Sequence, residues 1–198
     1  MANGKQIYTE DFYQEQARKL GLRARSYFKL EELDRKFRIV KRGQRILDLG
    51  AAPGSWSQFV LRKTLGDVHL TAIDLQEIEP FHREKVDPAR VVLLKADVSD
   101  ASLSLEGPFD VVLSDMAPRT MGVPSGDSAL SAELVRLSMA VALKRLKAGG
   151  TLVAKYLQGA ELPELQGEFR RDFASFKIFK PESSRRQSTE VFFTAWKR

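Results

Sequence analysis

The sequence predicts an α/β fold with a mostly parallel sheet and helices on both of its faces. Short β-branched runs alternate with segments of helical periodicity, and three of the first four runs close on an aspartate. Parallel strands need long crossover connections, which the intervening helical segments supply. The 198 residues are enough for one domain with a full core, so we expect a single domain over residues 1–198.

The expected elements follow one another without a repeat or a linker. A first helix begins after Thr9 and ends near Gly21, and a second runs from about Arg25 to Phe37. Strands are expected at residues 45–49, 68–74, 90–97, 109–115 and 151–157, with FKIF and EVFFTAW as two closing strands. Later helices are expected at 55–65, at 128–147 before the glycine pair 149–150, and from Pro163 onward.

Composition narrows the class of protein. There is no cysteine, there are only two histidines, and no apolar run approaches the roughly 20 residues that span a bilayer. The first residues lack the apolar core of a signal peptide. We therefore expect a cytoplasmic protein without a metal site.

Positive charge gathers at the two ends of the chain. Between Arg18 and Arg45 there are 11 basic and 3 acidic residues, and from Glu168 to Arg198 there are 8 basic and 4 acidic. The middle of the chain is acidic in balance. This pattern indicates a polyanion bound beside a site that the middle forms, although a solvated basic helix would give the same count.

The stretch LDLGAAPGSW, residues 47–56, follows the first strand and is the candidate ligand loop. Gly50 and Gly54 allow a tight turn and a close approach of a ligand to the main chain. The spacing D-x-G-x-x-x-G differs from the G-x-G-x-x-G of dinucleotide enzymes, which speaks against NAD or FAD. Because ligands of such sheets bind at the carboxyl ends of the strands, this loop marks the expected site.

Two further aspartates end strands at the same edge. Asp74 can accept both hydroxyls of a ribose, and Asp97 can accept from an adenine amino group. Nucleoside contacts without a phosphate cradle suit S-adenosylmethionine. Any one of these aspartates could instead be an ordinary turn residue.

The stretches SYFKLEELD, LDLGAAPGSWSQ, VVLSDMAP, VAKYLQG and PESSRRQSTEVFF resemble, in order, the FtsJ (RrmJ) family of ribosomal RNA 2′-O-methyltransferases. The resemblance implies a Rossmann-like class I methyltransferase fold, with a seven-stranded, mostly parallel sheet and an antiparallel last strand. It implies S-adenosylmethionine as cofactor, no metal, and a uridine of large-subunit ribosomal RNA as substrate. Ser55 and Arg119 depart from the family, which commonly has Gly and Asn there.

The resemblance also implies the site residues. The catalytic tetrad falls on Lys29, Asp115, Lys155 and Glu190. Cofactor contacts fall on Asp48, Gly50, Pro53, Gly54, Trp56, Asp74, Asp97 and Asp115, where Trp56 could equally be a core residue. The basic segment 1–40 is expected to help bind RNA, with contacts at Arg23, Arg25, Arg185 and Arg186.

The tetrad makes chemical sense on its own. A ribose hydroxyl is a poor nucleophile, so a site must orient it and help remove its proton. Lys155 stands inside an apolar strand, where desolvation and the charge of Lys29 favour a neutral, proton-accepting amine, while Asp115 opposes this. In the alternative, Lys155 stays charged, steers the hydroxyl, and the proton leaves late.

Other functions remain as alternatives. A base-nitrogen methyltransferase typically has an Asn/Asp-Pro-Pro-aromatic motif where this chain has Asp115-Met116-Ala117-Pro118. Transfer RNA is a second possible substrate. A non-catalytic ribosome-assembly factor on the same fold would need neither Lys155 nor Glu190. We expect a monomer.

Overall fold

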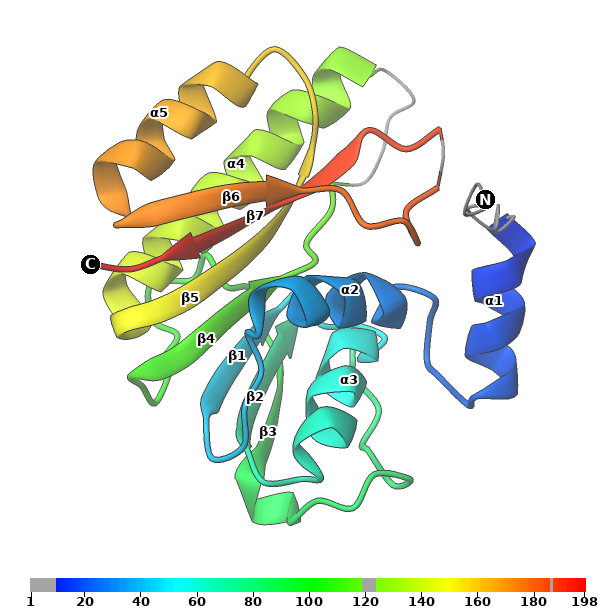
Figure 1. Ribbon diagram of the computed structural model, residues 1–198. Helices are drawn as coiled ribbons and strands as arrows, with labels where there is room; N and C mark the ends of the chain where they lie inside the picture. Colours follow the sequence, from blue (N-terminus) through cyan, green and yellow to red (C-terminus); the bar gives the residue numbers. More distant parts are fainter. Residues whose placement is uncertain (1–9, 119–123, 186) are drawn as a thin grey trace.

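The computed structural model describes residues 10–118, 124–185 and 187–198, and they form a seven-stranded sheet with helices on both faces (Figure 1). The strand order is β3-β2-β1-β4-β5-β7-β6. The strands are β1 (Arg45–Leu49), β2 (His69–Asp74), β3 (Val91–Lys95), β4 (Phe109–Ser114), β5 (Leu146–Leu157), β6 (Ser175–Phe179) and β7 (Glu190–Trp196). The predicted fold class, including the antiparallel last strand, is confirmed.

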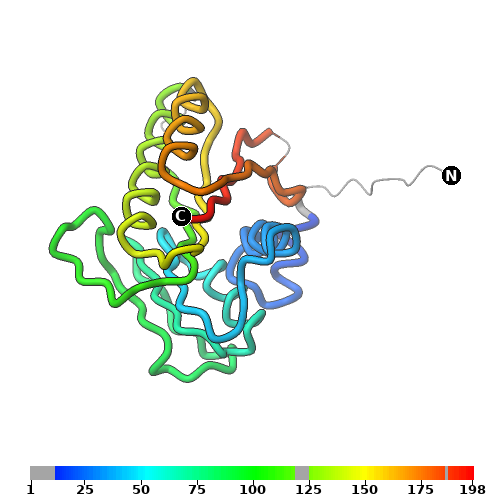
Figure 2. Tube along the Cα trace, turned by 60° about the vertical axis from the view of Figure 1, so that its left-hand side comes forward, coloured from blue at the N-terminus to red at the C-terminus, as the bar shows by residue number. Residues whose placement is uncertain are grey.

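Each face of the sheet has its own apolar core. The helices are α1 (Glu10–Lys19), α2 (Tyr27–Phe37), α3 (Ser55–Thr64), α4 (Pro124–Arg145) and α5 (Leu162–Asp172), with a short 3₁₀ turn at Pro88–Arg90. Leu30 of α2 and Val60 of α3 join the core on one face. Val135 of α4 and Phe169 of α5 join the core on the other, where Figure 2 shows these two helices side by side.

The direction of the strands decides where the site lies. Strands β1 to β5 run parallel, so they all end at one edge, which we call the carboxyl edge, and begin at the opposite amino edge. Strand β7 runs antiparallel between β5 and β6. Its first residue, Glu190, pairs with Leu157 at the end of β5 and thus reaches the carboxyl edge.

The boundary between α4 and β5 differs from the expectation and changes the sheet. Helix α4 ends at Arg145, and β5 already begins at Leu146, which pairs with Phe109 before the register shifts. The glycine pair therefore lies within the strand rather than between helix and strand. Gly149 has φ 72°, which lets the chain bend there and resume the ladder at Thr151.

Two expectations concern the ends and membranes. Thr9, the expected cap of the first helix, lies outside the described residues. In the described ranges, no helix has both the length and the apolar character that crossing a membrane requires.

Candidate functional site

Two ion pairs lie at the carboxyl edge and contain the four residues of the expected tetrad. Lys29 Nζ contacts both carboxylate oxygens of Glu190, at 2.7 and 2.8 Å. Lys155 Nζ donates to the main-chain oxygen of Asp115 at 2.6 Å and to its Oδ1 at 2.8 Å. Between 8% and 18% of each of these side chains is exposed. Burying a charged side chain costs free energy unless an opposite charge is close, and each of these four has such a partner.

The sheet register explains why distant residues meet. Glu190 lies opposite Leu157, and Lys155 lies two residues earlier on the same strand, so both side chains share one face. Helix α2 covers that face and carries Lys29 in its first turn. Asp115 directly follows β4, whose last residue pairs with the neighbour of Lys155.

The charge of Lys155 in one ion pair also affects the pKa of Glu190 in the other. Burial alone would raise the pKa of Glu190, but the charge and hydrogen bond of Lys29 outweigh it, and Lys155 adds to the effect. The pKa of Glu190 is therefore lower than its ordinary value. At neutral pH Glu190 is a carboxylate that neutralises a lysine, rather than a proton donor.

The loop before Glu190 is tied to α2. Glu32 accepts hydrogen bonds from the main-chain nitrogens of Glu182 and Ser183, at 2.6 and 2.9 Å. Arg25 donates to the main-chain oxygen of Ser183 at 2.7 Å. Figure 1 shows this loop lying over the start of α2. Arg25 and Glu32 thus hold the segment that delivers Glu190 to the site.

A pocket of about 350 Å³ opens beside Asp115. Its lining comes from the end of β2, from the segments after β1, β2, β3 and β4, and from one face of α4. The lining residues are Gly50, Ala52, Ile73, Asp74, Leu75, Gln76, Ala96, Asp97, Val98, Asp115, Met116, Ala117, Leu134 and Leu137. Gly50 is required here, because a Cβ at this position would lie 2.9 Å from Cα of Met116.

Asp74 and Asp97 are anchored by main-chain nitrogens. Asp74 Oδ2 accepts from Ala52 at 3.0 Å, and its Oδ1 accepts from Gln76 at 2.8 Å. Asp97 Oδ1 accepts from the main chain and the hydroxyl of Ser99, whose hydrogen bonds lower the pKa of this carboxyl group. A carboxylate has about four acceptor positions, so both aspartates keep capacity for a ligand.

Asp48 lies beneath the loop, outside the pocket lining. It is fully buried, and its Oδ2 accepts from the Ser57 hydroxyl at 2.7 Å. Among the described residues, no hydrogen-bond partner reaches its Oδ1. Burial raises the pKa of Asp48 to about 7, and the nearby charges of Asp115 and Asp74 act in the same direction although the Ser57 hydrogen bond opposes them.

Three other expected cofactor residues shape the loop without lining the pocket. Trp56 is 2% exposed, donates from Nε1 to the Ser26 main-chain oxygen at 3.0 Å, and packs against Phe192. Its position corresponds to the core alternative. Gly54 has φ 99°, which few residues other than glycine adopt, and Pro53 follows a cis peptide bond.

Arg23, an expected RNA contact, forms several contacts within the chain, and its contact with RNA stays a prediction. Its guanidinium donates to the main-chain oxygens of Pro53, Glu79 and Pro80, at 2.7 to 2.9 Å. It also lies over the Phe81 ring, 3.9 Å from the centroid. Through these contacts the Arg23 side chain joins the loop after β1 to the loop after β2.

The remaining expected contacts divide into two groups. Arg185 is exposed on the loop before Glu190 and interacts with other residues of the chain. Arg186 and Arg119 lie outside the described residues. Within the described part of the chain, no group of three or more acidic or histidine side chains is placed to hold a metal ion.

The sequence reasoning missed Glu32 and the apolar lining of the pocket. Leu75 and Met116 directly follow Asp74 and Asp115, two of the expected cofactor residues. Their place after a strand end could therefore have predicted that they line the pocket. Leu134 and Leu137 lie on the helical stripe of α4 and could not be separated from core residues by periodicity. Glu32 lies within the stretch SYFKLEELD, but no pattern singled it out, because its partners are main-chain atoms 150 and 151 residues away.

Known proteins resemble this chain over nearly its whole length. Residues 22–198 match the family described as FtsJ-like methyltransferase. A protein of Syntrophobacter fumaroxidans named "Ribosomal RNA large subunit methyltransferase E" is 46% identical over 92% of each chain. One of the same name from Desulfatibacillum aliphaticivorans is 36% identical over 98% of this chain and 92% of its own.

A solved structure supports the fold. The crystal structure from Plasmodium falciparum, named as a candidate ribosomal RNA methyltransferase, superposes with a TM-score of 0.76. It covers 88% of this chain and 97% of its own, at 23% identity. At that identity the likeness concerns the fold alone.

Proposed function

The chain belongs to the FtsJ-like methyltransferase family, and we propose that it transfers a methyl group from S-adenosylmethionine to a ribose 2′-hydroxyl of large-subunit ribosomal RNA. One observation carries the proposal. Asp115 lines the nucleoside-sized pocket and also binds Lys155, so the pocket and the two ion pairs meet at one residue. A methyl donor and a hydroxyl acceptor would thus be held side by side.

The pocket suits S-adenosylmethionine. Its volume of about 350 Å³ lies at the lower end of the range for ligand sites, roughly 300–1,000 Å³. Apolar side chains such as Leu75 and Leu137 offer surfaces for an adenine ring, while Asp74 can accept from ribose hydroxyls and Asp97 from an amino group. When bound, this cofactor supplies an activated methyl group on a sulfonium.

The ion pairs favour an orienting role for Lys155. A lysine ammonium has three donors, and two of them go to Asp115. The third is available for the 2′-oxygen, which Lys155 would hold in line with the methyl group. As the bond from sulfur to the methyl group breaks and the bond to oxygen forms, the hydroxyl proton would pass late to solvent. Lys29 and Glu190 form the adjoining wall and neutralise each other, so the wall can contact a ribose without adding a net charge.

The substrate follows from the relatives. Both curated relatives described above carry the name of a large-subunit ribosomal RNA methyltransferase, which favours this RNA over transfer RNA. The intact paired tetrad supports an enzyme rather than an assembly factor that only binds RNA. We also propose that the protein acts as a monomer in the cytoplasm.

The test is transfer of a labelled methyl group to large ribosomal subunits that lack the modification. A labelled ribose, recognised because a 2′-O-methyl group blocks alkaline cleavage at the next phosphodiester, is the expected product. Transfer RNA in a parallel reaction should stay unlabelled. Label on a base nitrogen, or no label with any RNA, would overturn the proposal.

A further inference from the structure

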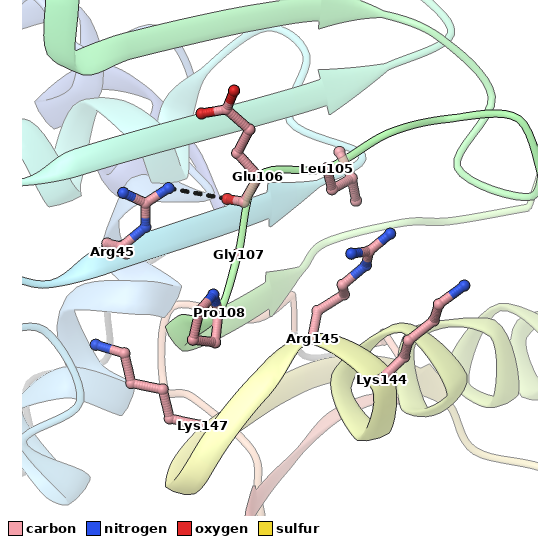
Figure 3. Close-up of a pocket in the computed structure, with 8 residues that line it drawn as sticks. All are labelled: Arg45, Leu105, Glu106, Gly107, Pro108, Lys144, Arg145 and Lys147. Carbon is pink, nitrogen blue, oxygen red and sulfur yellow. Dashed lines mark hydrogen bonds between the residues drawn. The ribbon is translucent and has the colours of Figure 1, made fainter.

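A group of basic side chains lies at the amino edge, far from the pocket and the ion pairs. It is a hollow of about 740 Å³ where β1, β4 and β5 begin (Figure 3). Its lining comprises Arg45, Leu105, Glu106, Gly107, Pro108, Lys144, Arg145 and Lys147. Figure 3 shows Arg45 and Lys147 on one side of Pro108, with Arg145 and Lys144 on the other. We call this set of four cations the amino-edge basic cluster.

The amino-edge basic cluster has more positive charge than its surroundings neutralise. Lys147 Nζ pairs with Asp110 at 2.7 Å, and the charge of Arg45 also acts on Asp110. Glu106 adds a second carboxylate to the lining, while the Arg45 guanidinium donates to the main-chain oxygen of Glu106 at 2.9 Å. The four cations of the cluster therefore face two carboxylates. In the described part of the chain, the side chains of Lys144 and Arg145 form neither a hydrogen bond nor an ion pair. An adjoining hollow that shares Lys147 adds two more cations, Arg38 and Lys41.

A purely structural role explains only part of this arrangement. Lys144 and Arg145 occupy the last turn of α4, where cations favour the helix dipole. That effect does not require Arg45 from β1 and Lys147 from β5 to converge on the same hollow. Convergence of cations from three elements is typical of a surface that binds a polyanion.

The direction of α2 explains why Arg38, Lys41 and Arg45 lie at the amino edge. Helix α2 has Lys29 at the carboxyl edge and ends at Phe37, so the basic residues that follow it in the sequence lie toward the amino edge. The basic segment from Arg18 to Arg45 therefore contributes cations to both edges of the sheet. Lys147 and Lys155 are both on β5, where eight residues span at most about 26 Å, and less here because the chain bends at Gly149.

We propose that the amino-edge basic cluster binds the phosphate backbone of the RNA substrate at a second point, remote from the methylated ribose. This inference rests on the proposed function, since it assumes an RNA substrate long enough to reach both edges. Phosphate contacts of this kind hold an RNA in position without reading its sequence. A long folded RNA can reach both edges, whereas a short oligonucleotide carrying the target nucleotide cannot.

The test compares two double variants with the same loss of charge. The test variant is Lys144→Gln with Arg145→Gln, and the control is Lys85→Gln with Lys177→Gln, two exposed lysines outside the hollow. For long ribosomal RNA at low salt, the test variant should bind on the order of tenfold more weakly, with a log K against log salt slope shallower by about 1 to 2. The control should match the wild type, and a short oligonucleotide should bind all three proteins equally.

Two further measurements test whether the effect comes from the end of α4 or from a partner other than RNA. Lys41→Gln lies outside α4 and should reduce the slope by about half as much, which a helix-end effect would not do. An unchanged slope in both variants, or weaker binding to anionic lipid vesicles with unchanged RNA binding, would overturn the inference. Wild-type methyl transfer is measured in the same samples: its absence overturns the proposed function, while a changed slope still supports the RNA surface.

Discussion

The two ion pairs and the neighbouring pocket share one edge of the sheet, but their carboxylates have different partners. Lys29, Glu190, Lys155 and Asp115 each have an opposite charge within 2.8 Å. In the pocket, Asp74 and Asp97 face a cavity and are held by main-chain nitrogens instead of cations. Asp48, below the loop, is buried, and no cation of the described residues forms an ion pair with it.

This difference indicates a division of labour. Carboxylates whose partners are main-chain N–H groups keep their charge and acceptor capacity for a ligand. Carboxylates that pair with lysines instead fix the position of an amine, which is what orientation of a hydroxyl requires. Removing a lysine from the ion pairs should therefore impair transfer, and removing Asp74 or Asp97 should impair cofactor binding. Asp115 belongs to both sets, so its removal should impair both.

The largest effect is expected at Lys155. Lys155→Ala should bind S-adenosylmethionine almost normally, because the lysine does not line the pocket, while methyl transfer falls roughly 10²–10⁴-fold. Calorimetry and single-turnover transfer measure the two properties. Lys155→Arg should not restore transfer, since a planar guanidinium cannot replace an amine.

Folding is the control for this variant. Lys155→Ala leaves Asp115 with one partner fewer, so melting temperatures must accompany the kinetics. Glu190→Gln serves as a second variant, because it keeps the shape of a tetrad side chain that does not line the pocket. A folded Lys155→Ala protein with near wild-type single-turnover transfer would remove the tetrad from the mechanism.

The next effect concerns stability at Asp48. Its pKa in the fold is about 7 against an ordinary 3.8, so the unfolded chain loses this proton first as pH rises. The free energy of unfolding should therefore fall between about pH 4 and pH 7, relative to Asp48→Asn, by on the order of 2–4 kcal/mol. Denaturant unfolding of both proteins at several pH values measures this, and parallel pH curves would mean that folded Asp48 is already ionised.

Asp74 tests the pocket directly. Asp74→Ala removes an acceptor for ribose hydroxyls, each charge-assisted bond contributing about 1.5–3 kcal/mol, so S-adenosylmethionine should bind markedly more weakly. Transfer at saturating cofactor should recover, because the ion pairs are intact. Unchanged affinity by calorimetry would exclude Asp74 from cofactor binding.

The smallest effect is expected at Asp97, and the chain offers a matched control. Asp100 accepts from the main chain and hydroxyl of Ser102 just as Asp97 does from Ser99, yet only Asp97 lines the pocket. Asp97→Ala and Asp100→Ala should lose similar stability. Only Asp97→Ala should weaken S-adenosylmethionine, by about 1 kcal/mol, as expected for one hydrogen bond. Equal affinities of the two variants would contradict a cofactor role for Asp97.

The sequence by itself determined the α/β class and the strand-end aspartates. Both depend on local regularities: alternating periodicities and polar residues at strand ends. Because parallel strands end at a common edge, the order of elements along the chain is enough to place Asp74, Asp97 and Asp115 together. Lys155 stands out in the sequence because a lysine inside an apolar strand is unusual.

Only the tertiary structure decided which charges meet. Lys29 and Glu190 are 161 residues apart, and their contact depends on β7 entering the sheet between β5 and β6 in the antiparallel direction. Arg23 and Trp56 could not be assigned from sequence, because a guanidinium and an indole suit either a ligand or internal partners. Only the tertiary structure shows their long-range contacts, to Glu79 and Phe192, while an RNA contact of Arg23 stays a prediction.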